Sequence, residues 1–202
     1  MSEIIVNGAV VQDTWQLVRL PVRDEPVQKQ AGKVVVMKVT GTQAATAEEA
    51  ASVVIPAGRV IVPLVVWLHR KAELTERLDA GELGVWLESF ETIETLIDSL
   101  DNLNRLPVIA LNFPKFVDGR HYSTAVMLRT RLGYTGEIRA IGDVLRDQLF
   151  FMNQVGFNAF AVRADRDIHD ALLGLKDFTE PYLGSTENRA PLFRRRARGG
   201  KA

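Results

Sequence analysis

Residues 107–141 read PVIALNFPKFVDGRHYSTAVMLRTRLGYTGEIRAI, and this stretch decides the fold. Its first seven residues are a continuous apolar run. Residues 123–132 repeat apolar side chains at helical spacing up to a glycine, and residues 137–141 form a second short run. Two strands joined through a single helix must run parallel, with a right-handed crossover. The stretch therefore predicts one strand–helix–strand unit of a parallel sheet.

The same alternation continues on both sides of this unit. Further strands are expected at residues 83–88 and 158–162, and further helices at 91–103, 144–155 and 168–175. The strands are short and apolar on both faces, which is typical of a sheet covered by helices. The fold class is therefore α/β. Four parallel units fit either a doubly wound sheet or a partial, barrel-like arc, and periodicity does not separate the two.

The N-terminal part of the chain follows a different pattern. Residues 3–20 are expected to form two short strands around an Asn7-Gly8 turn, as a β-hairpin at the edge of the body. Residues 22–59 are expected to hold one or two strands, including the VVVMKV run, with loops around 22–32 and 41–51. Residues 63–80 are expected to form a helix that begins at Pro63, with a strand over 60–68 as the alternative.

These patterns divide the chain into three parts. Residues 1–59 form a β-rich appendage, residues 60–183 the α/β body, and residues 184–202 a basic tail. The last nine residues hold five basic and no acidic residues, so the rest of this formally neutral chain has a net charge of −5. The tail lacks apolar periodicity, and we expect it to be disordered. The acidic body favours a solvated tail over one that binds nucleic acid.

Composition excludes several classes of protein. The chain has 202 residues, of which 47% are hydrophobic and 25% charged, an ordinary composition for a globular protein. It has no cysteine, which excludes disulfides, iron–sulfur ligation by this chain and thiolate nucleophiles. No apolar run approaches the roughly 20 residues of a membrane helix, and the first residues lack the basic region of a signal peptide. We expect a cytoplasmic protein without membrane association.

The expected parallel sheet indicates where a ligand would bind. In such sheets, ligands lie at the carboxyl ends of the strands, in the loops that lead into the helices. This rule places residues 89–90, 112–123, 142–147 and 163–167 on one rim. In the longest of these loops, Lys115 and Arg120 are candidates for holding an anion. Ser123 is a candidate for capping the following helix or for binding that anion at the helix N-terminus.

The neighbouring rim loop adds further candidates. Asp143 has the position of a helix N-cap. Arg146 follows in the first turn, where a cation is unfavourable to the helix dipole and needs an anionic partner. The candidates for acid–base catalysis are Asp118, His121 and Asp143, although Asp118-Gly119 is also a turn signal. Tyr122, Gly142 and Asp147 are expected to support the anion-binding residues Lys115, Arg120, Ser123 and Arg146.

Motifs for metals and cofactors are missing from the sequence. No His/Asp/Glu spacing indicates a metal site. The sequence has no GxGxxG, no Walker A and no Gly-x-Ser-x-Gly motif. We therefore expect no metal, and no cofactor is identifiable.

Three blocks within residues 113–163 carry a family resemblance: FPKFxDGRxYS, LRxRxGYxGExRAxGDVLRDQ and GFxAFxxR. With them, the chain resembles the bacterial domain-of-unknown-function family 934 over roughly residues 60–180. The resemblance implies a link to sulfite reduction. Members are commonly encoded beside sulfite reductase and adenylylsulfate-reducing enzymes and carry the label of oxidoreductase. It implies no catalytic residues.

Together these observations predict an accessory protein of assimilatory sulfite or sulfate reduction. A chain without cysteine or a dinucleotide motif is not expected to carry the electron centre. It would bind sulfite reductase or another enzyme of sulfate assimilation, a small sulfur oxyanion, or both, at the basic rim. One alternative is an independent enzyme with the same anion-binding site. Another is a structural module whose Asp/Arg pairs fix the rim loops, and the formation of homo-oligomers stays open.

Overall fold

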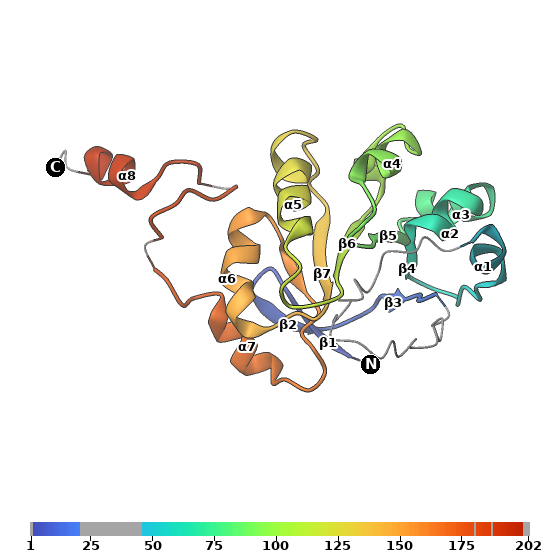
Figure 1. Ribbon diagram of the computed structural model, residues 1–202, viewed down its shortest axis with the longest axis horizontal. Helices are drawn as coiled ribbons and strands as arrows, with labels where there is room; N and C mark the ends of the chain where they lie inside the picture. Colours follow the sequence, from blue (N-terminus) through green and yellow to red (C-terminus); the bar gives the residue numbers. More distant parts are fainter. Residues whose placement is uncertain (1, 21–45, 180, 187, 200–202) are drawn as a thin grey trace, which may run out of the picture.

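The computed structural model describes residues 2–20, 46–179, 181–186 and 188–199, and eight strands in it form a single curled sheet, a half-barrel (Figure 1). The strands are β1 Glu3–Val6, β2 Ala9–Gln12, β3 Gln16–Leu17, β4 Val60–Pro63, β5 Leu83–Leu87, β6 Val108–Phe113, β7 Glu137–Gly142 and β8 Ala159–Phe160. The helices are α1 Ala47–Ser52, α2 Leu64–His69, α3 Lys71–Asp79, α4 Ile93–Asp98, α5 Arg120–Thr130, α6 Arg146–Val155, α7 Ile168–Gly174 and α8 Leu192–Gly199, with a 3₁₀ turn η1 at Leu103–Arg105.

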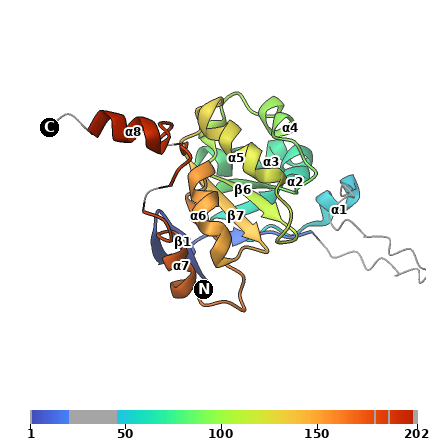
Figure 2. The same ribbon diagram turned by 60° about the vertical axis from the view of Figure 1, so that its left-hand side comes forward.

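The order of the strands selects the barrel-like alternative. The sheet runs β2-β1-β8-β7-β6-β5-β4-β3, and every neighbouring pair from β3 to β8 is parallel. A doubly wound sheet would reverse its strand order at a switch point, and this sheet does not. Right-handed crossovers between strands in sequence order place the connecting helices on one face. Turned by 60°, the molecule shows α5 and α6 lying over β6 and β7 (Figure 2).

The N-terminal strands occupy both edges of the same sheet. Asn7 and Gly8 have φ angles of 49° and 78° and form the turn of the predicted hairpin. Its strand β1 pairs antiparallel with β8, while β3 pairs parallel with β4 at the opposite edge. Strands from both sides of residue 59 thus belong to one sheet, and the division into an appendage and a body stays a prediction.

The two faces of the sheet bury different side chains. The outer face packs on the helices, and its core includes Val62, Leu87, Leu111, Ala140 and Phe160 from the strands with Leu96, Leu128 and Leu149 from the helices. The concave face has a smaller core of Ile61, Trp86, Val108, Ala110 and Ile141. Successive side chains of a strand point to opposite faces of the sheet. A strand whose two faces are both apolar therefore has a nearly continuous apolar sequence. This is why the sequence pattern predicts these strands well.

The region around Pro63 differs from the expected single helix. Pro63 is the last residue of β4, whose four residues are all buried, and it then serves as the N-cap of α2. The helical part is broken at Arg70, which has φ −115° and ψ 23° between α2 and α3. The Arg70 guanidinium bonds to Glu73 and to the carbonyl oxygen of Val53. The alternative of a strand is therefore correct for the first four residues and wrong for the rest.

Two further segments hold helices where loops or disorder are expected. Residues 47–52 form α1, because Thr46 and Glu49 make a reciprocal capping box. Residues 192–199 of the basic tail form α8, which begins directly after Pro191 and lies away from the sheet in both views (Figures 1 and 2). The expected strand at VVVMKV and the loop at 22–32 lie outside the described residues. Within the described ranges, no helix has the length and apolar character needed to cross a membrane.

Gly142 illustrates how tightly the strands approach at the end of β7. Its φ is +95°, and a Cβ at this position would overlap the carbonyl oxygen of Phe113 and lie 2.6 Å from Asn112 Oδ1. Gly142→Ala should lower the free energy of unfolding by about 2 to 5 kcal/mol, through the positive φ and the overlap together. Gly81 is a matched control, because its φ is +70° but its Cβ would meet nothing within 4 Å. In urea unfolding, Gly81→Ala should cost only about 1 to 2 kcal/mol; equal costs for the two variants would contradict the steric argument.

Candidate functional site

The carboxyl ends of β5 to β8 lie along one edge of the sheet, as the parallel pairing requires. The loops that leave them form what we call the rim: residues 88–92, 114–119, 143–145 and 161–167. The first helical residue after β6 is Arg120, three residues earlier than expected. Arg120, His121, Tyr122 and Ser123 therefore belong to the first turn of α5 and not to the loop.

Asp143 ties two rim loops together instead of capping a helix. Its Oδ2 accepts a hydrogen bond from the backbone N of Phe116 at 2.9 Å, and its Oδ1 accepts one from Arg163 Nη1 at 2.8 Å. The N-cap of α6 is Leu145, whose backbone N donates to Gln148 Oε1. The predicted capping role is thus wrong, because the helix begins two residues later. The side chain of Gln148 also donates to the carbonyl oxygen of Phe116, so the loop after β6 is held at one residue from two sides.

Arg120 is paired within its own turn. Its Nε and Nη2 donate to the two carboxylate oxygens of Asp118, at 2.9 and 2.5 Å, and Nη2 also donates to Ser89 Oγ at 2.5 Å. The guanidinium lowers the pKa of Asp118 to about 2, so Asp118 is a carboxylate at neutral pH and a weak base. Among the described residues, Nη1 of Arg120 has no hydrogen-bond partner.

His121 is buried against the end of β5. The residue is only 2% exposed, and its ring interacts with the backbone of Leu87 and Glu88. Burial lowers the pKa of His121 to about 4, so the imidazole is neutral at pH 7. Its Nε2 has no hydrogen-bond partner in the described part of the chain, which is unusual for a buried polar atom.

Two glutamates lie beside each other at the same strand end. Glu88 follows β5 directly, and its Oε2 accepts a hydrogen bond from Asn112 Nδ2 of β6 at 2.8 Å. Glu91 folds back, so that its Oε2 accepts from the backbone N of Glu88 at 2.7 Å. Burial and the charge of Glu88 together raise the pKa of Glu91 to about 7. Of the carboxyl groups on the rim whose pKa is shifted, Glu91 is the one that changes charge near neutral pH.

The remaining predicted residues are spread over the rim. Arg146 bonds to Asp177 at 3.1 Å and approaches Asp170, and it lines a separate depression with Asp147. Ser123 Oγ donates to the carbonyl oxygen of Arg120 in its own helix. The ring of Tyr122 packs between Phe113 and Phe151. Lys115 is exposed on the loop after β6. The structure therefore does not bring Arg120 and Arg146 to a common partner, and each is already paired with an aspartate.

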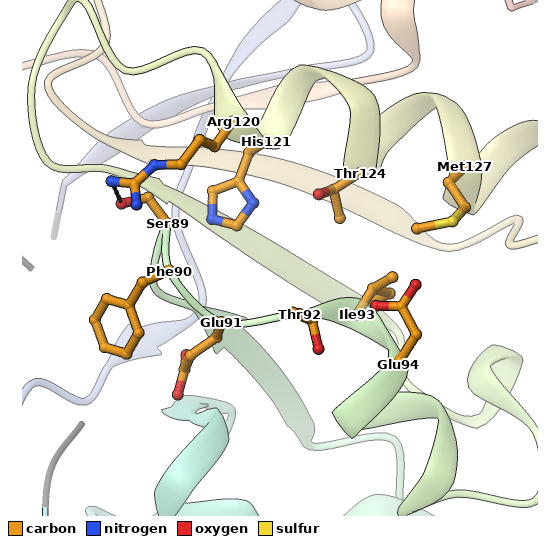
Figure 3. A pocket seen from close by; sticks show the side chains of 10 residues that line it. All are labelled: Ser89, Phe90, Glu91, Thr92, Ile93, Glu94, Arg120, His121, Thr124 and Met127. Carbon is orange, nitrogen blue, oxygen red and sulfur yellow. Dashed lines mark hydrogen bonds between the residues drawn. The ribbon is translucent and has the colours of Figure 1, made fainter. Parts of the chain in front are cut away.

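A depression of about 350 Å³ opens between α4 and α5 beside Arg120 (Figure 3). Figure 3 shows Arg120 and His121 on one wall and the segment from Ser89 to Glu94 on the other, with the Ser89–Arg120 hydrogen bond between the walls. Its lining is Ser89, Phe90, Glu91, Thr92, Ile93, Glu94, Arg120, His121, Thr124 and Met127. It is a polar hollow at the strand edge where parallel sheets hold ligands.

Some residues of the sequence blocks serve the opposite end of the sheet. Arg129 donates to the carbonyl oxygens of Gly156, Tyr134 and Gly136, all within 3.0 Å. The hydroxyl of Tyr134 donates to the carbonyl oxygen of Leu106, and a Cβ at Gly136 would overlap that hydroxyl. These contacts satisfy backbone groups that have no strand partner. Arg129, Tyr134 and Gly136 of the second block are thus explained by structure rather than chemistry.

The described residues contain no group of three or more His, Cys, Asp or Glu side chains arranged to hold a metal ion. The rim can instead exchange protons through Glu91 and donate hydrogen bonds through Arg120. Glu88, Glu91 and Asn112 are absent from the residues that the sequence predicts for the site. The sequence pattern predicts a strand that includes Glu88 and a helix that includes Glu91, so neither residue is assigned to the rim loop. In the structure, the strand ends at Leu87 and the helix begins at Ile93, which leaves both glutamates in the loop.

Comparison with known protein families gives a match over part of the chain. The model of the family described as "Bacterial protein of unknown function (DUF934)" matches residues 84–193, just over half of the chain. The matched range begins at residue 84, later than the resemblance over roughly residues 60–180, and it extends into the basic tail that begins at residue 184. Neither a search of curated proteins nor a search of solved structures finds a match.

The raised pKa of Glu91 predicts a pH-dependent stability. The folded state favours the neutral carboxyl, so its contribution is fully present below pH 4.5 and is lost as the pH rises through about 7. Glu91→Gln should therefore gain roughly 2 to 3 kcal/mol in free energy of unfolding, relative to the parent, between pH 4.5 and pH 8. Urea titrations across this range measure the difference. Glu94→Gln, at an exposed neighbour, is the control, and a Glu91→Gln difference independent of pH would contradict the assignment.

Proposed function

Because the chain belongs to the DUF934 family of bacterial proteins of unknown function, we propose that it is an accessory protein of assimilatory sulfite reduction that docks on a reductase through the loop after β6. The link to sulfite reduction comes from what the family resemblance implies about neighbouring genes. This role would place the protein in the cytoplasm. The proposal that the loop after β6 is a docking surface rests on one observation in the structure.

That observation is an apolar tip on a firmly held loop. Phe116 is 42% exposed and Val117 is 80% exposed, side by side at the tip of the 114–119 loop. Exposed aromatic and aliphatic side chains on an ordered loop are typical of a surface that a partner covers. The loop is anchored at the tip itself, since the backbone N and O of Phe116 bond to Asp143 and Gln148.

The anchoring lowers the cost of binding. A loop that is already ordered loses little conformational entropy when a partner covers it. The backbone N of Asp118 bonds to the carbonyl oxygen of Lys115, which closes the turn around the two apolar residues. The aspartate–arginine pairs of the rim support this role, because they fix the loops. These pairs join Asp118 to Arg120 and Asp143 to Arg163.

The same pairing argues against a strong oxyanion site at the expected residues. An anion at Arg120 competes with Asp118, and one at Arg146 competes with Asp177. The proposal therefore rests on the reductase as the partner, and a sulfur oxyanion is not needed for it.

The docking surface predicts a loss of association when its tip becomes charged. Phe116→Asp combined with Val117→Asp should weaken binding to the sulfite reductase of the same organism at least tenfold, since an interface anchor contributes roughly 2 kcal/mol. Binding is measured by co-purification and by biolayer interferometry with purified reductase. The double variant should also slow growth on sulfate, while growth on a reduced sulfur source stays unchanged.

Val54 provides the matched control. It is 86% exposed and precedes β4, outside the rim. Val54→Asp should leave association intact. No association between the parent protein and the reductase, together with normal growth on sulfate when the gene is deleted, would remove the proposed role.

A further inference from the structure

The last described segment of the chain leaves the body and carries apolar side chains into solvent. We call residues 181–186 and 188–199, which include α8, the C-terminal arm. In both views, α8 lies apart from the sheet and the helices that cover it (Figures 1 and 2). Three large apolar side chains of the arm are mostly exposed: Tyr182 at 66%, Leu183 at 64% and Phe193 at 57%. So many exposed apolar groups in a short segment are typical of a surface that a partner covers.

The helix at the end of the arm needs support from outside. It has eight residues, and isolated helices shorter than about 12 to 15 residues are marginal in water. Two hydrogen bonds tie it to the start of the arm: Leu192 N donates to the carbonyl oxygen of Tyr182, and Arg195 Nη2 donates to that of Pro181. These bonds fix the path of the arm but leave Phe193 exposed. A surface that covers Phe193 would supply the missing stabilisation.

The charge of the arm indicates what its partner carries. The sequence of α8, LFRRRARG, has four arginines and no acidic residue. Arg194 lies over the ring of Phe193, 5.8 Å from its centroid, and makes no ion pair with any described residue. The partner therefore combines an apolar hollow for Phe193 with carboxylates for the arginines. Nucleic acids and anionic lipids fit less well, because the net charge of −5 on the rest of the chain repels them.

The chain itself presents such carboxylates on α4. Residues 82–104 hold six acidic and no basic residues. Glu94 and Asp98 are four residues apart, so they share one face of α4, and like charges at this spacing destabilise a helix. Both residues are exposed, and neither carboxylate has an ion-pair or hydrogen-bond partner in the described part of the chain. This face of α4 therefore lacks a cation.

The depression between α4 and α5 lies beside these carboxylates. Its volume is about 350 Å³, and its lining includes the apolar side chains of Ile93 and Met127 together with Glu94. Figure 3 shows Met127 reaching from α5 toward Ile93 and Glu94 on α4. A hollow of this kind suits a single aromatic anchor, the usual centre of a protein–protein contact. A guanidinium next to that anchor would meet Glu94.

We propose that the C-terminal arm docks on a second copy of this chain, with Phe193 in the depression between α4 and α5 and Arg194 at Glu94 and Asp98. In both views, α5 lies between α8 and α4, so the arm's own depression is on the far side of that helix (Figures 1 and 2). Two copies related by a twofold axis can exchange arms, and each contact then forms twice. The doubling brings the buried area closer to the roughly 1,000 Å² that a stable interface needs.

Sedimentation velocity on the full chain tests the exchange through the oligomeric state. We expect a dimer that weakens when sodium chloride is raised from about 0.05 M to about 0.5 M, because salt screens exposed charges. Arg194→Glu and Glu94→Arg should each weaken dimerisation at least about tenfold, since each places like charges opposite one another. Glu76→Arg is the matched control, because Glu76 is an exposed glutamate on α3, away from the depression. It should leave the dimer unchanged.

Mixing the two charge-reversal variants identifies the partner as a second copy. In a mixed pair, the unchanged Arg194 of one copy meets the unchanged Glu94 of the other. At the second contact both charges are reversed, so attraction is restored there as well. The mixture should therefore form a dimer at concentrations where each variant alone is a monomer. This recovery also shows that both variants are folded.

The outcomes separate the arm from the docking loop after β6. Phe116→Asp with Val117→Asp should leave the dimer intact whether or not a reductase binds, because neither residue belongs to the arm contact. A parent chain that stays monomeric at about 0.2 mM would overturn the proposal, since even a weak specific contact forms there. So would a mixture that recovers no dimer, or a dimer that Arg194→Glu leaves unchanged. Binding of α8 to RNA or to vesicles of anionic lipid without dimer formation would assign the arm to a polyanion instead.

Discussion

The parallel pairing of β5, β6 and β7 in sequence order is the constraint on which the rest of the structure depends. It aligns Val85 with Ile109 and Ile109 with Ile138, so that three strands share one register, and only the two end residues of β7 are partly exposed. Because the strands point the same way, their carboxyl ends meet at one edge, and loops that are distant in sequence become neighbours. A one-residue slip would exchange the helix-facing and concave-facing side chains of a strand, and two separate cores oppose that slip.

The chemistry of the rim follows from which charges are already satisfied. Asp118 with Arg120, Asp143 with Arg163 and Arg146 with Asp177 are ion pairs that fix loops and leave little charge for a ligand. Glu91 differs, because its neighbour is a second carboxyl group and its environment is partly apolar. The group on this edge that can change its charge near neutral pH is therefore Glu91, which has no cationic partner among its described hydrogen bonds. The pairs around it supply the rigidity that both a docking loop and a binding site require.

The sequence predicts the strands better than it predicts the site, for physical reasons. Residues 108–113 and 138–141 are buried, so a short run rich in apolar residues is enough to find them, although Arg139 interrupts the second run. The break at Arg70 and the capping box at Thr46 involve a few local hydrogen bonds, which the periodicity of apolar residues does not reveal. The rule that ligands lie at the carboxyl ends of parallel strands identifies the edge of the sheet, but the partner of Arg120 depends on where α5 begins. The helix begins three residues earlier than expected, and Arg120 in its first turn bonds to Asp118. Local geometry decides pairings of this kind.

The two edges of the half-barrel have a consequence for the order of folding. Both are built from the first 17 residues, yet Ile5 pairs with Phe160 while Gln16 pairs with Val60. During synthesis, β3 can join its neighbour after about a third of the chain has emerged, whereas β1 must wait for about four fifths of it. Bringing β1 to β8 closes a long loop, and the entropic cost of this closure is offset only by contacts that form late in folding. The β1–β2 hairpin is thus expected to pair with β8 last, after the parallel β/α part of the sheet has formed.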